Sequence, residues 1–260
     1  MPAPKVCDLF LFSGQSNMAG RGIVTKAHGQ GAPAVPHGVG YEFRAVSDPN
    51  QLHRIAEPFG LRENRPEGID DGTRKTGSMV SAFVNACYER TGIPIVAVSA
   101  SKGDSSISEW QPGTPYFRDL VWRMHAAVCF LRERGCAIRH CFLAWCQGEK
   151  DAQNGKNVQL YRMELEHFWN QLQVEGMEKC FLISIGLHNS DMPWNFRGII
   201  EAQERLAKDN QNVIMASRKF REMKARGLMI DAVHYVQQAY NEVGADAGAV
   251  AGAYIAQMIS

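Results

Sequence analysis

No run of apolar residues in this chain approaches the roughly 20 that a membrane-spanning helix needs. Excess charge is also absent: the formal net charge is +1, and no block of lysine and arginine with interleaved aromatic residues occurs, so we expect no nucleic-acid partner. The start of the chain shows no secretory signal, because the apolar stretch after Lys5 is short, is interrupted by Asp8 and is followed by no small-residue cleavage site. These absences predict a cytoplasmic protein with no membrane partner.

Metal-binding spacings are missing as well. The sequence holds no CxxC pair and no HExxH motif, so we expect neither a metal nor any other cofactor. Its cysteines number seven, which is odd, and most lie in apolar runs, which predicts buried free thiols in a reducing compartment. Cys146 is the one candidate for a catalytic cysteine, because it lies within a motif.

Length and composition fit one large α/β domain, with 260 residues of which 45% are hydrophobic and 21% charged. Residues 21–77 are rich in glycine and proline, and we expect a loop-rich insertion there that shapes the substrate site. From residue 78 onward, apolar runs of strand length alternate with longer segments of helical periodicity. The expected strands are 6–12, 93–100, 138–145, 180–185 and 213–216, and the expected helices are 78–90, 117–134, 158–174, 199–209 and 236–258. This alternation predicts an α/β fold with a single domain over residues 1–260, a three-layer α/β/α sandwich around a mainly parallel central sheet.

Polar motifs follow three of these strands, and a fourth precedes the last helix. They are residues 14–17, 101–106, 146–151 and 231–234. Parallel sheets bind ligands in the crevice beyond the carboxyl ends of their strands, so these four segments are expected to meet at one rim.

Ser16, at the exit of the first strand, is a candidate nucleophile, and a serine hydroxyl needs a base to take its proton. Among the eight histidines, His234 is favoured because Asp231 stands three residues earlier. In a tight turn this spacing lets the carboxylate accept from Nδ1–H while Nε2 faces the nucleophile. The alternative is a turn in which Asp231 only caps the last helix.

The order and spacing of these motifs resemble the SGNH hydrolase superfamily, and more closely the carbohydrate esterase family 6 and sialate O-acetylesterase group. The resemblance covers nearly the whole chain and rests on Gly-Gln-Ser-Asn-Met at 14–18, Gly-Asp-Ser-Ser-Ile at 103–107 with Glu-Trp at 109–110, Trp-Cys-Gln-Gly-Glu-Lys-Asp at 145–151, and Asp-Ala-Val-His at 231–234. Glu-Ala-Gln at 201–203 resembles another recurring segment of these esterases. The resemblance implies the flavodoxin-like sandwich of SGNH hydrolases.

This resemblance also implies that Ser16 is the nucleophile, His234 the general base and then acid, and Asp231 the residue that orients the imidazole. It implies an oxyanion hole made of the backbone N–H groups of Ser16 and Gly103 and the side-chain amide of Gln147. Attack on an ester carbonyl creates a tetrahedral oxyanion, and one donor aimed at it is worth about 3–4 kcal/mol.

Two positions depart from the family pattern. The family often has a second glycine where Asp104 stands, and we expect this carboxylate to point away from the oxyanion and to cap a short helix. An arginine commonly precedes the Glu-Ala-Gln segment, but Ile200 stands there, and Arg197 lies one helical turn earlier as a candidate substitute.

Several further residues have two readings. Glu149 is either a competing triad acid or a hydrogen-bond partner that locks Gln147, and Trp110 either forms the floor of the sugar site or belongs to the core. Gln15 and Asn17 are candidates either to support the nucleophile loop or to contact the substrate. The arginines considered as ligands for a substrate carboxylate are Arg21, Arg74 and Arg197.

Together these observations predict a carboxylic ester hydrolase, a serine esterase that removes O-acetyl groups from carbohydrates through an acyl-enzyme. The expected substrate is a small acetylated carbohydrate, and the motifs fit acetylated xylo-oligosaccharides and O-acetylated sialic acids alike. A catalytically silent carbohydrate-binding module on the same fold is an alternative from a different class. A lipase or thioesterase is a third reading, although no long apolar loop near the motifs suggests an acyl groove.

Overall fold

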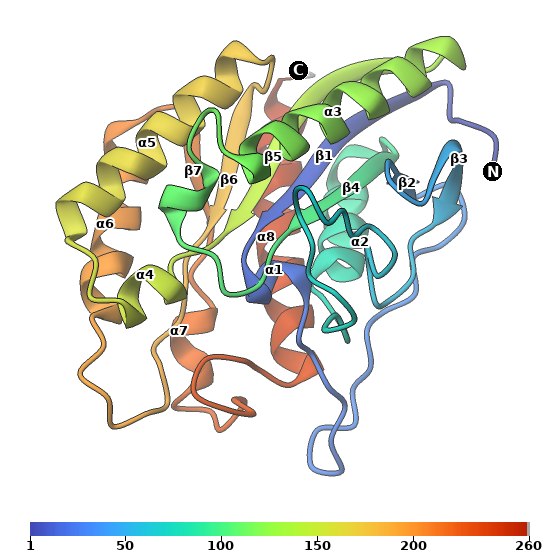
Figure 1. The fold of residues 1–260 in the computed structure, drawn as a ribbon. Coiled ribbons are helices and arrows are strands. Elements are labelled where there is room, and N and C mark those ends of the chain that lie inside the picture. Colours follow the sequence, from blue (N-terminus) through green and yellow to red (C-terminus); the bar gives the residue numbers. More distant parts are fainter. Residues whose placement is uncertain (259–260) are drawn as a thin grey trace.

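A seven-stranded sheet forms the centre of the molecule in the computed structural model, which describes residues 1–258 (Figure 1). The strand order is β3-β2-β4-β1-β5-β6-β7, and every neighbouring pair is parallel except β2 with β3. The strands are β1 (Val6–Gly14), β2 (Gly40–Arg44), β3 (Asp48–Arg54), β4 (Ile95–Ser101), β5 (Ala137–Cys146), β6 (Lys179–Ile183) and β7 (Val213–Ser217). The predicted mainly parallel sheet is confirmed.

Helices cover both faces of this sheet because successive side chains of its buried strands point to opposite sides. Leu9 and Leu11 of β1 belong to one buried cluster, which includes residues of α3 (Pro115–Glu133), α5 (Val158–Val174) and α6 (Phe196–Asp209). Phe10 and Phe12 belong to the other, which includes residues of α2 (Val80–Thr91), α7 (Phe220–Met223) and α8 (Gln237–Gln257). The predicted three-layer sandwich is therefore confirmed, with a separate core on each face of the sheet (Figure 1).

The expected helices and strands lie where the periodicity placed them, with shifts of up to three residues at their ends. The region 21–77, expected to be loop-rich, contains in addition the hairpin of β2 and β3 at one edge of the sheet. Its second strand has the sequence DPNQLHR, which is polar and lacks apolar alternation, so no strand pattern marks it. The short helices α1 (Ser16–Ala19), α4 (Glu149–Gln153) and α7 were not predicted, and the short helix expected after Asp104 is η1 (Ile107–Trp110). Of these four, α1, α4 and η1 lie within or directly beside the motifs.

The order of the strands places a topological switch point at β1. After β1 the chain forms β2 and β3 at one edge of the sheet and returns to β4 beside β1, and it then crosses over β1 to form β5 on the other side. Gly14, the last residue of β1, pairs with Ser101 of β4 and with Cys146 of β5, so the three strands end level with one another. Open α/β sheets bind ligands at such a point, because the two flanking loops diverge there and leave a crevice.

Within residues 1–258, none of the helices combines the length and the apolar character required to cross a lipid bilayer.

Candidate active site

The nucleophile candidate stands at the sharp exit of β1. Gly14 has φ +137°, and a Cβ at this position would lie 2.0 Å from the carbonyl oxygen of Cys146, so only glycine fits. Gln15 then leads into α1, and its side-chain Oε1 accepts the backbone N–H groups of Gly148 and Lys150 at 3.1 and 3.2 Å. Ser16 is the first residue of α1 and is 6% exposed. Gln15 therefore ties the nucleophile loop to the loop after β5.

Three side chains from the two ends of the chain form a line at this exit. The Oγ atom of Ser16 lies 2.9 Å from Nε2 of His234, and Nδ1 of the same ring lies 2.8 Å from Oδ2 of Asp231. The other carboxylate oxygen of Asp231 accepts the backbone N–H groups of Val233 and His234, each at 2.8 Å. The turn at 231–234 thus fixes the carboxylate from two directions.

The protonation state of Asp231 follows from these bonds. Partial burial favours the neutral acid, but the hydrogen bonds from the His234 ring and from two backbone N–H groups outweigh it, and the pKa of Asp231 falls to about 2. An ionised carboxylate only accepts hydrogen bonds, so Nδ1 of His234 carries a proton, and Nε2 lies at hydrogen-bond distance from the Ser16 hydroxyl. This arrangement leaves the imidazole ready to take a proton from Ser16.

Asn17 is fully buried behind Ser16, and its side chain is saturated with protein partners. Its Nδ2 donates to Oε1 of Glu149 and to the carbonyl oxygen of Val233, and its Oδ1 accepts from the Tyr240 hydroxyl at 2.6 Å. Asn17 therefore joins α1 to the Asp231–His234 turn and to α8, which favours its supporting role, and its contact with substrate stays a prediction.

Glu149 is buried, and burial raises the pKa of its carboxyl group. Its hydrogen bond goes to Asn17, whereas the carboxylate next to Gln147 belongs to Asp151. The expected bond between Glu149 and Gln147 is absent from the described residues, and the bond that does form locks the nucleophile loop instead.

Gly103, the second expected oxyanion donor, follows β4 beside the nucleophile loop. Its backbone N–H donates to Oδ1 of Asp71 at 2.7 Å, and both oxygens of that carboxylate also accept from Nη2 of Arg21, at 3.0 and 2.8 Å. A Cβ at residue 103 would lie 2.5 Å from the guanidinium and 2.7 Å from the carboxylate, so a larger residue there would displace the Arg21–Asp71 pair. The Gly103 N–H is thus bound to a carboxylate in the resting protein.

Gln147, the third expected donor, is also engaged. Its Nε2 donates to the carbonyl oxygen of Ser105 at 3.0 Å and to Oδ2 of Asp151, while its Oε1 is buried and has no hydrogen-bond partner among residues 1–258. Asp151 accepts from Ile107 N–H as well, so one carboxylate holds both η1 and the Gln147 amide. The roles of Gly103 and Gln147 in an oxyanion hole stay predictions.

Two expectations about the loop after β4 need correction. Asp104 adopts φ +58° and points away to Nζ of Lys150 at 2.8 Å, but it caps no helix, because Ser106 and Glu109 form the capping box of η1. Trp110 is fully buried, with its ring edge-on to Trp145 and its Nε1 bonded to Ser105 Oγ at 3.0 Å. It belongs to the core, so its reading as the floor of a sugar site is wrong.

The three arginines considered as ligands for a substrate carboxylate either lie apart from the triad or bind another side chain. Arg197 is exposed on the first turn of α6, where it lines a hollow of about 190 Å³ with His188, Trp194 and Lys224. Arg21 is paired with Asp71, and Arg74 is exposed. None of the contacts found within residues 1–258 brings Arg197 to Ser16 or His234.

Cys146 is buried at the end of β5, and burial raises the pKa of its thiol far above the ordinary value. Because the thiolate is the reactive form of cysteine, this position favours a structural thiol. Across residues 1–258, no group of three His, Cys, Asp or Glu side chains is arranged to hold a metal ion.

Sequence reasoning missed Asp71 and Tyr240, which contact the predicted site residues Gly103 and Asn17. Asp71 stands in a loop with no motif spacing, and Tyr240 has the helical spacing of an ordinary core residue. No local signal marks either of them, because their partners are 32 and 223 residues away in the sequence.

The chain is similar to a known family, to a curated protein and to solved structures. Residues 6–254 match the family described as carbohydrate esterase, sialic acid-specific acetylesterase. A probable carbohydrate esterase of Arabidopsis thaliana is 26% identical over 176 residues, which are 64% of this chain and 62% of that protein. This chain therefore matches about three fifths of the length of that curated relative.

Solved structures share the fold. A structure of the Arabidopsis thaliana protein superposes with a TM-score of 0.70 at 22% identity and covers 97% of this chain and 98% of its own. NanS superposes with a TM-score of 0.63 at 15% identity over 99% and 100% of the two chains. A carbohydrate acetylesterase from Xanthomonas citri superposes with a TM-score of 0.55 at 16% identity, over 96% of this chain and 57% of its own.

The family match covers nearly the whole chain and all four motifs, and it confirms the predicted resemblance to this group of carbohydrate esterases. The chain belongs to the carbohydrate esterase family of sialic acid-specific acetylesterases.

Proposed function

We propose that this protein is a serine esterase that hydrolyses O-acetyl esters on carbohydrates, with Ser16, His234 and Asp231 as its catalytic triad. The observation that carries the proposal is the continuous line from Asp231 Oδ2 through the imidazole to Ser16 Oγ, with contacts of 2.8 and 2.9 Å. Membership of a carbohydrate esterase family supports the same chemistry.

In the first half of the reaction, Nε2 of His234 takes the hydroxyl proton while Ser16 Oγ bonds to the acetyl carbonyl carbon. The tetrahedral intermediate then collapses: the bond to the sugar oxygen breaks, and His234 returns the proton to that oxygen. In the second half, water attacks the acetyl-enzyme, again with His234 as base, and acetate and free Ser16 are released. Asp231 stays ionised throughout and stabilises the imidazolium.

The oxyanion of each intermediate needs donors. The backbone N–H of Ser16 lies in the first turn of α1, where backbone N–H groups have no acceptor within the helix, so the proposal assigns it as the first donor. Gln147 is proposed as a further donor on the family resemblance, and its amide would have to exchange its bond to Asp151 for one to the oxyanion. Gly103 N–H is proposed on the same resemblance, and it would have to share its proton between Asp71 and the oxyanion.

The proposed substrate is a small acetylated carbohydrate, and the family description favours an O-acetylated sialic acid over an acetylated xylo-oligosaccharide. Acetate release from matched panels of both substrates distinguishes them. Preferential release from the sialic acids is expected; preferential release from xylo-oligosaccharides would reassign the substrate within the same chemistry.

The triad is tested first with Ser16→Ala. This change removes the attacking oxygen, so hydrolysis of an aryl acetate is expected to fall by about 10⁶-fold, to the level of the residual catalysis. A fluorophosphonate probe should label the wild-type protein at Ser16 and leave the variant unlabelled.

Ser108→Ala is the matched control, since Ser108 is exposed on η1 and should leave both readouts unchanged. Full activity of Ser16→Ala would refute the proposed nucleophile. Absence of both hydrolysis and labelling in the wild type would favour a silent carbohydrate-binding module, whereas a preference for long acyl chains would favour a lipase or thioesterase.

A further inference from the structure

The bond between Asp71 and Gly103 lies outside the triad and is not explained by it. The Asp71 side chain has no exposed surface, and its carboxylate binds two segments at once: Gly103 after β4 and Arg21 just after α1. We propose that Asp71 is a positioning residue that, together with Arg21, fixes the loop after β4 relative to the nucleophile. This inference rests on the proposed esterase function.

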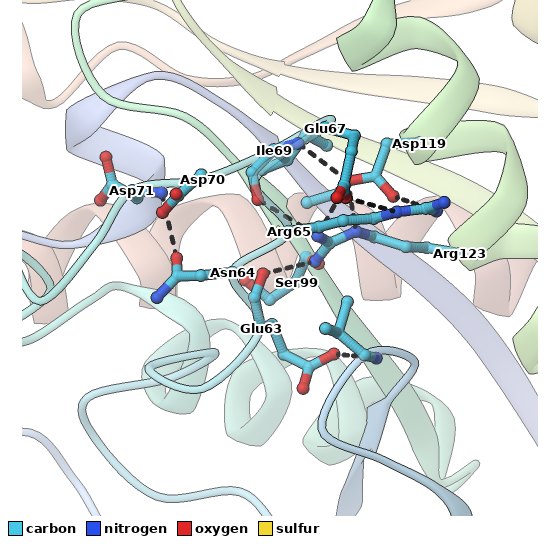
Figure 2. A network of polar contacts seen from close by, with 12 residues as sticks. Glu63, Asn64, Arg65, Glu67, Ile69, Asp70, Asp71, Ser99, Asp119 and Arg123 are labelled. Carbon is cyan, nitrogen blue, oxygen red and sulfur yellow. Dashed lines mark hydrogen bonds and ion pairs between the residues drawn. The ribbon is translucent and has the colours of Figure 1, made fainter.

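Asp71 is held at its own backbone as well as at its carboxylate. Its N–H donates to Oδ1 of Asn64 at 3.0 Å, within the same loop (Figure 2). Ile69, two residues earlier, donates its N–H to Oδ2 of Asp119 at 2.9 Å and accepts from Arg123. The loop that carries Asp71 is therefore fixed at Asp71 itself and two residues before it.

A buried ion pair on α3 provides the anchor for this loop. Arg123 is fully buried, pairs with Asp119 at 2.9 Å, and donates to the carbonyl oxygens of Glu63 and Ser99 at 2.9 and 2.8 Å. Figure 2 shows both side chains reaching from their helix towards the loop of residues 63–71. Because Ser99 belongs to β4, the same guanidinium joins the loop to the strand that leads into Gly103.

The two segments that Asp71 binds flank Ser16. The loop after β4 begins at Lys102, whose N–H donates to the carbonyl oxygen of Gly14, two residues before the nucleophile. Arg21 stands directly after Gly20, which ends α1, and its Nη1 donates to the Gly20 carbonyl oxygen at 3.1 Å. A displacement of Asp71 would therefore be transmitted to both sides of the nucleophile.

The opposite interpretation treats Asp71 as a competitor that occupies an oxyanion donor. An N–H bound to a carboxylate oxygen at 2.7 Å is not free for an oxyanion, so on that interpretation removal of the carboxylate would raise activity. The anchored loop keeps the carboxylate on Gly103, because a side chain buried on all sides and paired with Arg21 does not swing away at low cost. The positioning interpretation therefore assigns the oxyanion chiefly to Ser16 N–H and Gln147, and gives the Asp71–Gly103 bond the task of holding the loop. The two interpretations predict opposite changes in kcat when the Asp71 carboxylate is removed: a decrease if it positions the loop and an increase if it competes for Gly103 N–H.

The test compares Asp71→Asn and Asp71→Ala with the wild type. In each, kcat for an aryl acetate is divided by the fraction of protein that a fluorophosphonate probe titrates, so that misfolded molecules do not count. We expect kcat per titrated site to fall about 100-fold in Asp71→Ala, with KM little changed, because an error of about 1 Å in positioning costs this much. Asp71→Asn keeps an oxygen acceptor for Gly103 N–H and should lose less.

Asp70→Asn serves as the matched control, because Asp70 is the neighbouring acid and accepts from Gly72 N–H within its own turn. Its kcat should equal that of the wild type. Arg21→Lys keeps the positive charge but loses the planar guanidinium that binds both oxygens of Asp71. Like Asp71→Asn, it should lower kcat per titrated site. These two variants still test the inference if Asp71→Ala does not fold.

Unchanged or raised kcat per titrated site in both Asp71→Asn and Arg21→Lys would overturn the inference. A fall only in melting temperature and in titrated fraction would assign Asp71 a purely structural role and would equally overturn it. Failure of the esterase proposal is distinguishable, because it would appear as an inactive and unlabelled wild type.

Discussion

At the scale of single residues, the acid that contacts His234 is the less buried of the two carboxyl groups considered for this role. Asp231 is half-exposed, yet its pKa falls to about 2 because three N–H groups donate to it against the opposing effect of burial. Glu149 is buried, its pKa is raised by burial, and its hydrogen bond goes to Asn17. Hydrogen-bond geometry, rather than depth in the fold, decides which carboxylate can stabilise an imidazolium.

This difference predicts unequal effects of two isosteric substitutions. Asp231→Asn should lower kcat by about 10⁴-fold, because the neutral amide no longer holds the proton on Nδ1 and no longer stabilises the charged ring. Glu149→Gln should cost far less, because its side chain keeps an oxygen for Asn17. Steady-state kinetics on an aryl acetate checks both, and the reverse order of losses would move the triad acid to Glu149.

At the scale of elements, the exit of β1 depends on how closely β1 and β5 approach. Gln15 N–H donates to the carbonyl oxygen of Cys146 at 2.9 Å, so the backbone of β5 fills the space where a side chain at residue 14 would lie. The positive φ of Gly14 then turns the chain into α1 and brings Ser16 towards His234. The motif needs its glycine for strand packing as much as for the turn.

We therefore expect Gly14→Ala to lower the free energy of unfolding by at least about 2 kcal/mol, from backbone strain together with overpacking against Cys146. Gly38→Ala is the control: Gly38 also has a positive φ, but a Cβ added there would meet no atom within 4 Å, so only about 1–2 kcal/mol of strain applies. Urea denaturation measures the free energy of unfolding of both variants, and an equal decrease in Gly14→Ala and Gly38→Ala would contradict the packing argument.

At the scale of the whole molecule, one buried guanidinium connects parts that the sequence keeps far apart. Arg123 of α3 donates to a carbonyl oxygen of β4 and to two carbonyl oxygens of the loop that carries Asp71. That loop in turn reaches the segment after β4, so α3 on one face of the sheet supports the rim where Ser16 lies (Figures 1 and 2).

Arg123→Met should reduce the free energy of unfolding by about 3–5 kcal/mol, because it leaves the buried Asp119 carboxylate with only the partly exposed Arg65 as its cation and removes the donor to three carbonyl oxygens. Arg132→Met on the same helix changes an exposed side chain and should stay within about 0.5 kcal/mol of the wild type. Equilibrium denaturation measures the free energy of unfolding of both variants. A small decrease for Arg123→Met would mean that other contacts anchor the loop that carries Asp71.

The sequence by itself determined the alternation of strands and helices, because apolar periodicity is a local property of the chain. It also determined which motifs meet, because parallel strands must end at the same edge of the sheet. The tertiary structure alone decided the partners of the polar side chains: Asp71 with Gly103, Asn17 with Glu149 and Tyr240, and Trp110 inside the core. The physical reason is that burial and hydrogen bonding depend on contacts between residues up to 223 positions apart, which no local pattern records.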